Sequence, residues 1–165
     1  MSDHRVRRIM FVCSGNICRS PLAHRLFERQ AKARGLDHLI EVESSGTDSY
    51  HVGDEADSRM RATAKKHGWH LSHRARQLQS RDLNEWDILF AMDRGHLRRI
   101  EQMQRSGGGC NVLLFRTYDP FGDASDPGDV PDPYYGGPEG FEHVYEIVER
   151  TGTAILDALE DGRLP

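Results

Sequence analysis

The chain has 165 residues, of which 37% are hydrophobic and 29% are charged, and its formal net charge at pH 7 is −4. These values favour one compact domain spanning residues 1–165. The apolar run after the basic N-terminal residues, Ile9–Cys13, is too short for a signal peptide or a membrane span. Three cysteines do not match the disulfide framework of a small secreted protein, and no set of Cys and His residues has the spacing of a zinc finger. We therefore expect a cytoplasmic protein without membrane insertion and without a nucleic-acid partner.

The two ends of the chain differ in charge. Residues 1–35 carry eight Arg or Lys against two acids, whereas residues 116–165 carry twelve acids against three Arg. The basic end favours an anionic ligand. Two solvated faces of opposite sign would give the same counts, so charge alone leaves both interpretations open.

The first predicted element is a buried strand over residues 8–13, a short apolar run that ends at Ser-Gly. A helix is predicted over 20–35. Ser20 is a suitable N-cap and Pro21 a suitable first helical residue. Gly35 is a typical residue to end such a helix.

Three further strand-and-helix pairs follow along the chain. They are predicted at 39–46 and 57–68, at 86–92 and 93–109, and at 111–115 and 141–160. This alternation predicts an α/β fold with a parallel sheet and helices on both faces, a three-layer sandwich. Ligands of such sheets bind beyond the carboxyl ends of the strands. A loop of about 25 residues precedes the last helix, and loops of that length are usually functional.

The stretch FVCSGNICRSPLA, residues 11–23, combines the chemistry of a dianion site with a nucleophile. A glycine-containing loop that leads into a helix points backbone N–H groups at one spot, which attracts anions. The fork of Arg19 matches two phosphate oxygens. Cys13 would be favoured there as a thiolate, and Ser20 could donate a hydrogen bond to its sulfur. Asn16 could hold an unusual backbone conformation. The alternative for Cys13 is inert packing after a strand.

This stretch resembles the signature of the low-molecular-weight protein tyrosine phosphatases. Later segments resemble that family in the right order: SSGT (44–47), HLSHRARQL (70–78), FAMD (90–93) and VPDPYYGG (130–137). The similarity covers nearly the whole chain. We accordingly expect a four-stranded sheet with strand order 2-1-3-4, a phosphotyrosine-containing protein as substrate, and no metal or cofactor.

The resemblance also implies roles for individual residues. Cys13 would be the nucleophile, Arg19 the phosphate clamp and Asp132 the general acid and base. Substrate or phosphate would be bound by Ser14, Gly15, Asn16, Ile17, Cys18, Ser20, Tyr50, Tyr134 and Tyr135, and Ser44 and His73 would support the loop. Asp93 would cap the third helix or orient Arg19.

The long loop offers five aspartates, of which Asp132 is the best candidate for the acid. Pro131 and Pro133 stiffen the backbone around it. Two tyrosines follow and could line a site for an aromatic substrate. Asp119, which also precedes a proline, is the alternative.

Two other functions remain open from the sequence. An arsenate reductase of the same fold would use the same loop, but it needs downstream cysteines that reach Cys13, and only Cys110 follows residue 18. A non-catalytic phosphate-binding or redox-sensing module could use a disulfide between Cys13 and Cys18. Ile17 favours phosphotyrosine as substrate, because relatives that act on phosphoarginine tend to carry threonine at that position.

Overall fold

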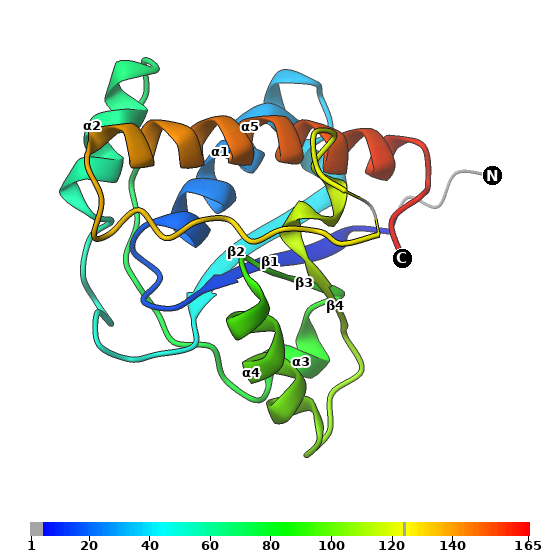
Figure 1. The fold of residues 1–165 in the computed structure, drawn as a ribbon. Coiled ribbons are helices and arrows are strands. Elements are labelled where there is room, and N and C mark those ends of the chain that lie inside the picture. Colours follow the sequence, from blue (N-terminus) through cyan, green and yellow to red (C-terminus); the bar gives the residue numbers. More distant parts are fainter. Residues whose placement is uncertain (1–4, 124) are drawn as a thin grey trace.

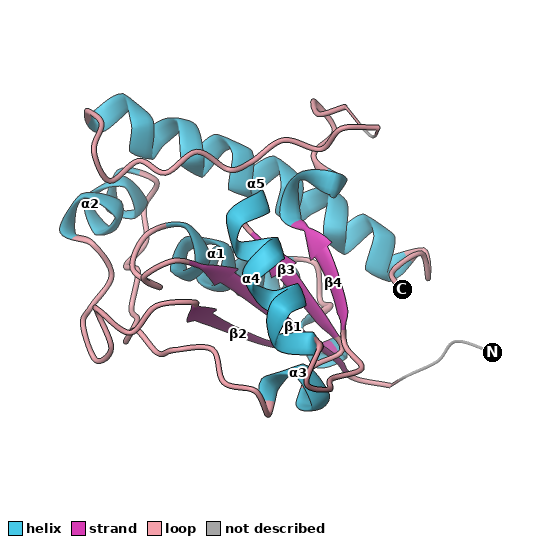
Figure 2. Cartoon of the chain, turned by 60° about the horizontal axis from the view of Figure 1, so that its bottom comes forward, coloured by secondary structure: helices cyan, strands magenta, loops and turns pink. Residues whose placement is uncertain are grey.

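The structure is a computed structural model that describes residues 5–123 and 125–165. A central sheet is covered by helices on both faces (Figures 1 and 2). The strands are β1 (Arg7–Cys13), β2 (Ile40–Gly46), β3 (Ile88–Ala91) and β4 (Asn111–Leu114). The α-helices are α1 (Arg19–Ala33), α2 (Ser58–Lys66), α3 (Asp82–Glu85), α4 (Arg94–Gln104) and α5 (Pro138–Glu160).

The sheet is parallel with strand order β2-β1-β3-β4, which confirms the predicted fold and order. Side chains of β1 alternate between two hydrophobic clusters, as a strand buried on both faces requires. Ile9 and Phe11 belong to the cluster under α1 and α5, and Met10 and Val12 to the cluster under α3 and α4. Figure 2 shows α4 lying across the sheet on the side opposite to α1 and α5.

The helix boundaries differ from the prediction at a few points. The expected N-cap, Ser20, was wrong: α1 begins at Arg19, and Ser20 is buried in its first turn. Its hydroxyl is free for another role because it does not cap the helix. The turn α3 was not predicted, since it has only four residues and no periodic pattern. Gly35 ends α1 as expected, with a φ of 69° that favours glycine.

The carboxyl ends of the strands lie on one edge of the sheet and place the functional loops together. Cys13 is the last residue of β1, and Asp93 follows the end of β3. The long loop after β4 returns to this edge, where the Val130 N–H donates to the carbonyl of Met92 at 2.8 Å. Among the described helices, none is both long and apolar enough to cross a membrane.

Candidate active site

The loop between β1 and α1 owes its shape to Asn16, a buried residue with a left-handed φ of 59°. Its side-chain oxygen accepts hydrogen bonds from the Arg76 N–H at 2.9 Å and from His73 Nε2 at 3.0 Å. His73 Nε2 also lies 2.9 Å from the Asn16 carbonyl oxygen. Asparagine is among the few residues that tolerate this backbone region. These contacts fix the backbone conformation of the loop at Asn16.

The pKa of His73 is lowered to about 4, chiefly because the imidazole is buried. Near neutral pH the ring is therefore neutral. Since Nε2 contacts two oxygen acceptors of Asn16, it must carry the proton and donate. His73 is therefore a donor to the loop at Asn16, and its supporting role stays a prediction.

The Cys13 sulfur lies at the start of the loop, 2.9 Å from the Ser20 hydroxyl. The Asn16 side-chain N–H donates to the same hydroxyl at 2.8 Å. Because Ser20 Oγ accepts from Asn16, its own hydrogen can be donated to the sulfur or to the Ser45 carbonyl, which lies farther away at 3.4 Å. The three side chains thus form a short chain of hydrogen bonds that ends at the thiol.

The guanidinium of Arg19 is buried and held on one side by the protein. Its NH1 donates to Asp93 Oδ2 at 2.9 Å and to the Val130 carbonyl at 3.0 Å. The Asp93 Oδ1 accepts from the N–H of His96 at 2.9 Å and so caps α4. Both roles considered for Asp93 are therefore present at once. The pKa of Asp93 is lowered, because these hydrogen bonds and nearby charges outweigh its burial.

His96 joins this network to the loop. Its Nε2 lies 2.8 Å from Ser14 Oγ, and its Nδ1 lies 3.2 Å from Asp93 Oδ1 without the geometry of a hydrogen bond. Burial and the charge of Arg19 lower the pKa of His96 to about 4, so the imidazole is neutral near pH 7. A continuous path of contacts consequently runs from Arg19 through Asp93 and His96 to Ser14.

The long loop brings Asp132 to the same place. Its Oδ2 lies 3.7 Å from Arg19 NH2, and its Oδ1 accepts from the Tyr134 N–H at 3.0 Å, which fixes the carboxylate. The side chain of Asp132 is 48% exposed, so water has access to it.

The alternative acid, Asp119, has a different environment. Its side chain is fully buried between Arg116 and Arg150, with contacts of 2.8–2.9 Å. These arginines, together with the Phe121 N–H, lower its pKa despite its burial. Asp119 is an ionised anchor of the loop rather than a proton donor at the cavity.

A cavity of about 240 Å³ unites these groups. The predicted residues that line it are Cys13, Ser14, Gly15, Ile17, Cys18, Arg19, Tyr50, Asp132, Tyr134 and Tyr135. Tyr134 and Tyr135 form an edge-to-face pair with ring centroids 5.0 Å apart, and both are exposed, as is Tyr50. The cavity therefore has a polar floor and an aromatic rim.

Ser44 and Cys18 differ in how they relate to the cavity, which Cys18 lines and Ser44 does not. Ser44 contacts the Nδ1 of His24 at 3.1 Å, so it lies beside the loop network rather than within its chain of bonds. Cys18 is buried, and its pKa is raised, first by burial and then by Asp57. The Cys18 thiol is therefore protonated near neutral pH.

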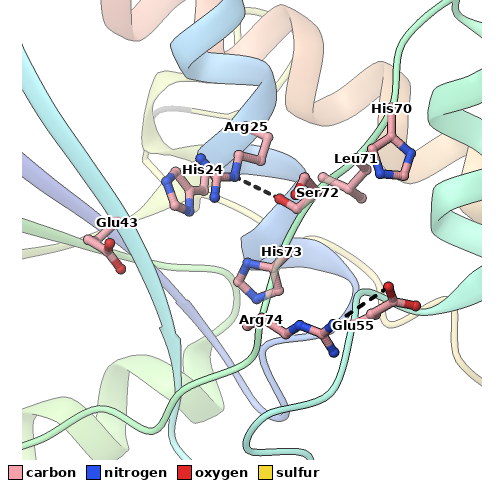
Figure 3. A pocket seen from close by; sticks show the side chains of 9 residues that line it. All are labelled: His24, Arg25, Glu43, Glu55, His70, Leu71, Ser72, His73 and Arg74. Atoms are coloured by element: carbon pink, nitrogen blue, oxygen red, sulfur yellow. Dashed lines mark hydrogen bonds and ion pairs between the residues drawn. The ribbon is translucent and has the colours of Figure 1, made fainter.

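A second cavity, of about 280 Å³, lies behind the loop on the other side of His73 (Figure 3). Arg25 crosses it to donate to the Ser72 carbonyl at 2.8 Å, and Arg74 lies 3.9 Å from Glu55. None of the residues expected to be catalytic lines it. The residues expected to be catalytic instead line the cavity that contains Cys13.

Sequence reasoning did not identify three residues around the loop. These are His96, which contacts Ser14, and Asp48 and His51, which line the cavity. His51 crowds Gly15 so closely that a Cβ at that glycine would lie 2.8 Å from the imidazole. The segment after SSGT could have suggested Asp48 and His51, because it leaves the carboxyl end of β2 beside the loop.

Comparisons with known proteins agree with this geometry. The model of the family "Low molecular weight phosphotyrosine protein phosphatase" matches residues 8–163. A Streptomyces coelicolor protein named low molecular weight protein-tyrosine-phosphatase is 43% identical over 93% of this chain and 94% of its own length. The crystal structure of a protein tyrosine phosphatase from Entamoeba histolytica is 33% identical, with a TM-score of 0.83 over 96% of this chain and 99% of that one. A Drosophila arginine phosphatase is 29% identical, with a TM-score of 0.84 over 92% and 97%.

Proposed function

Because the chain belongs to the low molecular weight phosphotyrosine protein phosphatase family, we propose that its Cys13 cavity hydrolyses phosphotyrosine in phosphoprotein substrates. The observation that carries this proposal is the cavity itself. A thiol with a hydroxyl donor at 2.9 Å, a buried guanidinium and a carboxylate at 3.7 Å from that guanidinium line one cavity. This arrangement suits nucleophilic attack on a bound phosphate dianion.

In the first step the Cys13 thiolate attacks phosphorus while the tyrosine oxygen leaves. The loop N–H groups and the free donors of Arg19 stabilise the equatorial oxygens. NH1 is already engaged with Asp93 and Val130, which fixes the plane of the guanidinium. The Ser20 hydroxyl stabilises the negative charge on sulfur. Asp132 protonates the leaving oxygen.

In the second step water attacks the phosphocysteine, the sulfur–phosphorus bond breaks and phosphate leaves. Asp132, now a carboxylate, takes the proton from that water. Its partial exposure gives water access to the carboxylate. The hydrogen bond from the Tyr134 N–H keeps one oxygen fixed and leaves the other for proton transfer.

The arsenate-reductase alternative finds no support in the position of Cys110. Asn111, the residue after it, pairs with Ile88, which pairs with Ile9. Cys13 lies four residues beyond Ile9, so the two cysteines are separated by about 16 Å along the strands. Cys110 therefore lies toward the opposite edge of the sheet, too far from Cys13 for thiol exchange.

Phosphotyrosine is the proposed substrate because the cavity wall is apolar and aromatic. Ile17 lines it and offers no hydrogen bond, while Tyr134 and Tyr135 offer ring surfaces. A phosphoserine side chain is too short to bring phosphorus to a thiol at the floor.

The three cysteines are free thiols, which suits a reducing compartment such as the cytoplasm. Cell fractionation tests this proposed location.

The test is kcat/KM for matched peptides that carry phosphotyrosine, phosphoserine, phosphothreonine or phosphoarginine. We expect phosphotyrosine to be the best substrate, and Cys13→Ser to abolish turnover while it retains vanadate binding. Phosphatase activity in purified Cys13→Ser protein would refute the nucleophile. A phosphoarginine value equal to that of phosphotyrosine would refute the substrate and leave the mechanism intact.

A further inference from the structure

A basic groove runs along α2 next to the aromatic rim. It has a volume of about 610 Å³, and its walls include Ser58, Arg61, Lys65, Trp69 and His70. All the ionisable side chains in its lining are basic, although the chain as a whole carries a net charge of −4. His70 also lines the cavity behind the phosphate loop (Figure 3), so this residue is shared by the cavity and the groove. Such a local reversal of charge indicates an anionic partner.

The charges of the groove are largely unused within the protein. Among the described residues, Lys65 and His70 have no ion-pair partner, and both are exposed. Arg61 donates to the Ala56 carbonyl and lies 3.6 Å from Glu55, a long and solvated pair. The back wall is rigid, since the Trp69 indole N–H donates to the Tyr145 hydroxyl at 2.9 Å.

The groove begins where the catalytic rim ends. The Asp57 N–H donates to the Ile17 carbonyl at 2.8 Å, which ties the start of α2 to the phosphate loop. Arg59 donates to the Tyr134 carbonyl at 2.8 Å, and its guanidinium lies 5.1 Å from the Tyr134 ring. Ser58, between Asp57 and Arg59 in the chain, already lines the groove. A polypeptide that leaves the rim can therefore pass directly onto α2.

The length of the groove along α2 determines which positions of a bound peptide can contact its basic residues. Lys65 lies seven positions after Ser58, which is about 10 Å along an α-helix. An extended peptide covers this distance in about three residues. The start of α2 adjoins Ile17 of the cavity wall, so a segment would enter the groove about one or two positions from the phosphotyrosine. Its side chains about three to five positions from the phosphotyrosine would then reach Arg61 and Lys65.

We propose that this groove binds an acidic segment of the phosphoprotein substrate, three to five residues from the phosphotyrosine. The inference rests on the proposed function, and it names the substrate class that the site selects. Carboxylates of the segment would meet Arg61, Lys65 and His70, whose charges are solvated and screened by salt. The groove therefore promotes binding of the peptide, and this contribution to kcat/KM falls as ionic strength rises.

The test compares phosphotyrosine peptides with three Glu at positions three to five, on either side of the phosphotyrosine, with peptides that carry Gln there. At low salt we expect kcat/KM for the better Glu peptide to exceed its Gln counterpart about fivefold, as is typical of solvated charge contacts. The difference should be lost at 0.5 M NaCl and in the double variant Arg61→Gln, Lys65→Gln, and it should be reduced in Lys65→Gln and reduced further in Lys65→Glu. The control for the double variant Arg61→Gln, Lys65→Gln is the double variant Arg98→Gln, Arg105→Gln. The control removes the same amount of positive charge from exposed positions on and next to α4.

Turnover of p-nitrophenyl phosphate separates this inference from the proposed function. If that turnover and hydrolysis of the Gln peptide persist while the Glu and Gln peptides are hydrolysed equally, only the groove is refuted. If the Arg98→Gln, Arg105→Gln control loses the preference as fully as the groove variant, net charge explains it and the groove is refuted. Binding of anionic phosphatidylserine vesicles by the wild type but not by Lys65→Glu, without any peptide preference, would assign the groove to a membrane surface instead.

Discussion

Asn16 and Asp132 are two residues whose surroundings, rather than their side chains alone, give them a role. Asn16 keeps a φ of 59° because His73 and the Arg76 N–H occupy its side-chain oxygen. Asp132 differs from the other aspartates of its loop by facing Arg19 at 3.7 Å in the cavity. Asp119 and Asp129 have structural partners instead, Asp129 accepting from the Arg94 N–H at 3.0 Å.

The acid is tested by varying the leaving group. Asp132→Asn should slow hydrolysis of phosphotyrosine by about 10²–10⁴-fold, the usual contribution of a general acid. It should slow an aryl phosphate with a very acidic leaving group much less, because that group leaves without a proton. Single-turnover kinetics on both substrates measure the contrast. The assignment fails if Asp119→Asn shows the contrast and Asp132→Asn does not.

The contact between Ser14 and His96 predicts that Ser14→Ala lowers both the stability of the protein and its affinity for vanadate. Ser14→Ala leaves His96 Nε2 buried without its partner at 2.8 Å. An unpaired buried group of this kind costs about 1–3 kcal/mol of unfolding free energy. Because His96 also contacts Asp93, which orients Arg19, we expect vanadate affinity to fall as well. Calorimetric vanadate titration measures it, and Ser125→Ala, in an exposed turn, is the control. Unchanged vanadate affinity would show that His96 has no influence on Arg19.

At the scale of elements, the long loop is held by ion pairs rather than by regular structure. Asp119 joins Arg116, just after β4, to Arg150 on α5. Arg116 also donates to the Asp129 carbonyl at 3.1 Å, three residues before Asp132. The position of the expected acid thus depends on a buried carboxylate more than ten residues away.

Asp119→Asn should consequently lower the free energy of unfolding and also alter the conformation of the long loop. Breaking a buried ion pair costs about 3–5 kcal/mol, and the lower end applies here because both arginines are partly exposed. Urea denaturation measures the loss. Asp123→Asn, at an exposed position of the same loop, is the matched control and should change the free energy of unfolding much less than Asp119→Asn does. Equal stability of the two variants would contradict the anchoring role.

At the scale of the whole molecule, two buried neutral histidines make stability depend on pH. His73 and His96 have pKa values of about 4 in the folded protein, below the value of about 6.5 expected in the unfolded chain. As the pH falls from about 6.5 to 4, the unfolded chain takes up protons that the folded protein does not. The free energy of unfolding should therefore decrease by up to about 1.4 kcal/mol per pH unit for each histidine.

Urea denaturation at pH 7.5 and pH 5 measures this dependence. His73→Gln should reduce the slope, whereas His143→Gln, at an exposed position on α5, should leave it unchanged. Carboxylates with lowered pKa, such as Asp93 and Asp119, lose their stabilising contribution only below about pH 4. Their effect is therefore separated from that of the histidines. An unfolding free energy that is equal at both pH values would contradict the neutral state of the two rings.

Features that depend on residues close together along the chain could be predicted from the sequence alone. Alternating apolar runs and helical stripes indicated the four strands, the main helices and the parallel sheet, because burial imposes those periods locally. Cys13, Asn16 and Arg19 lie within one short loop, so their spacing was enough to indicate a phosphate site. Ser20 was misread as a cap, because its buried contact with the sulfur cannot be told from spacing.

Tertiary structure decided everything that joins distant segments. It separated Asp132 from Asp119, since the arginine that pairs with each aspartate is set by the path of the loop. It also brought His96 to Ser14 across 82 positions and placed the start of α2 beside Ile17 of the phosphate loop. The physical reason is that a periodic pattern records which face of an element is buried, whereas a polar contact between elements depends on their packing and leaves no period in the sequence.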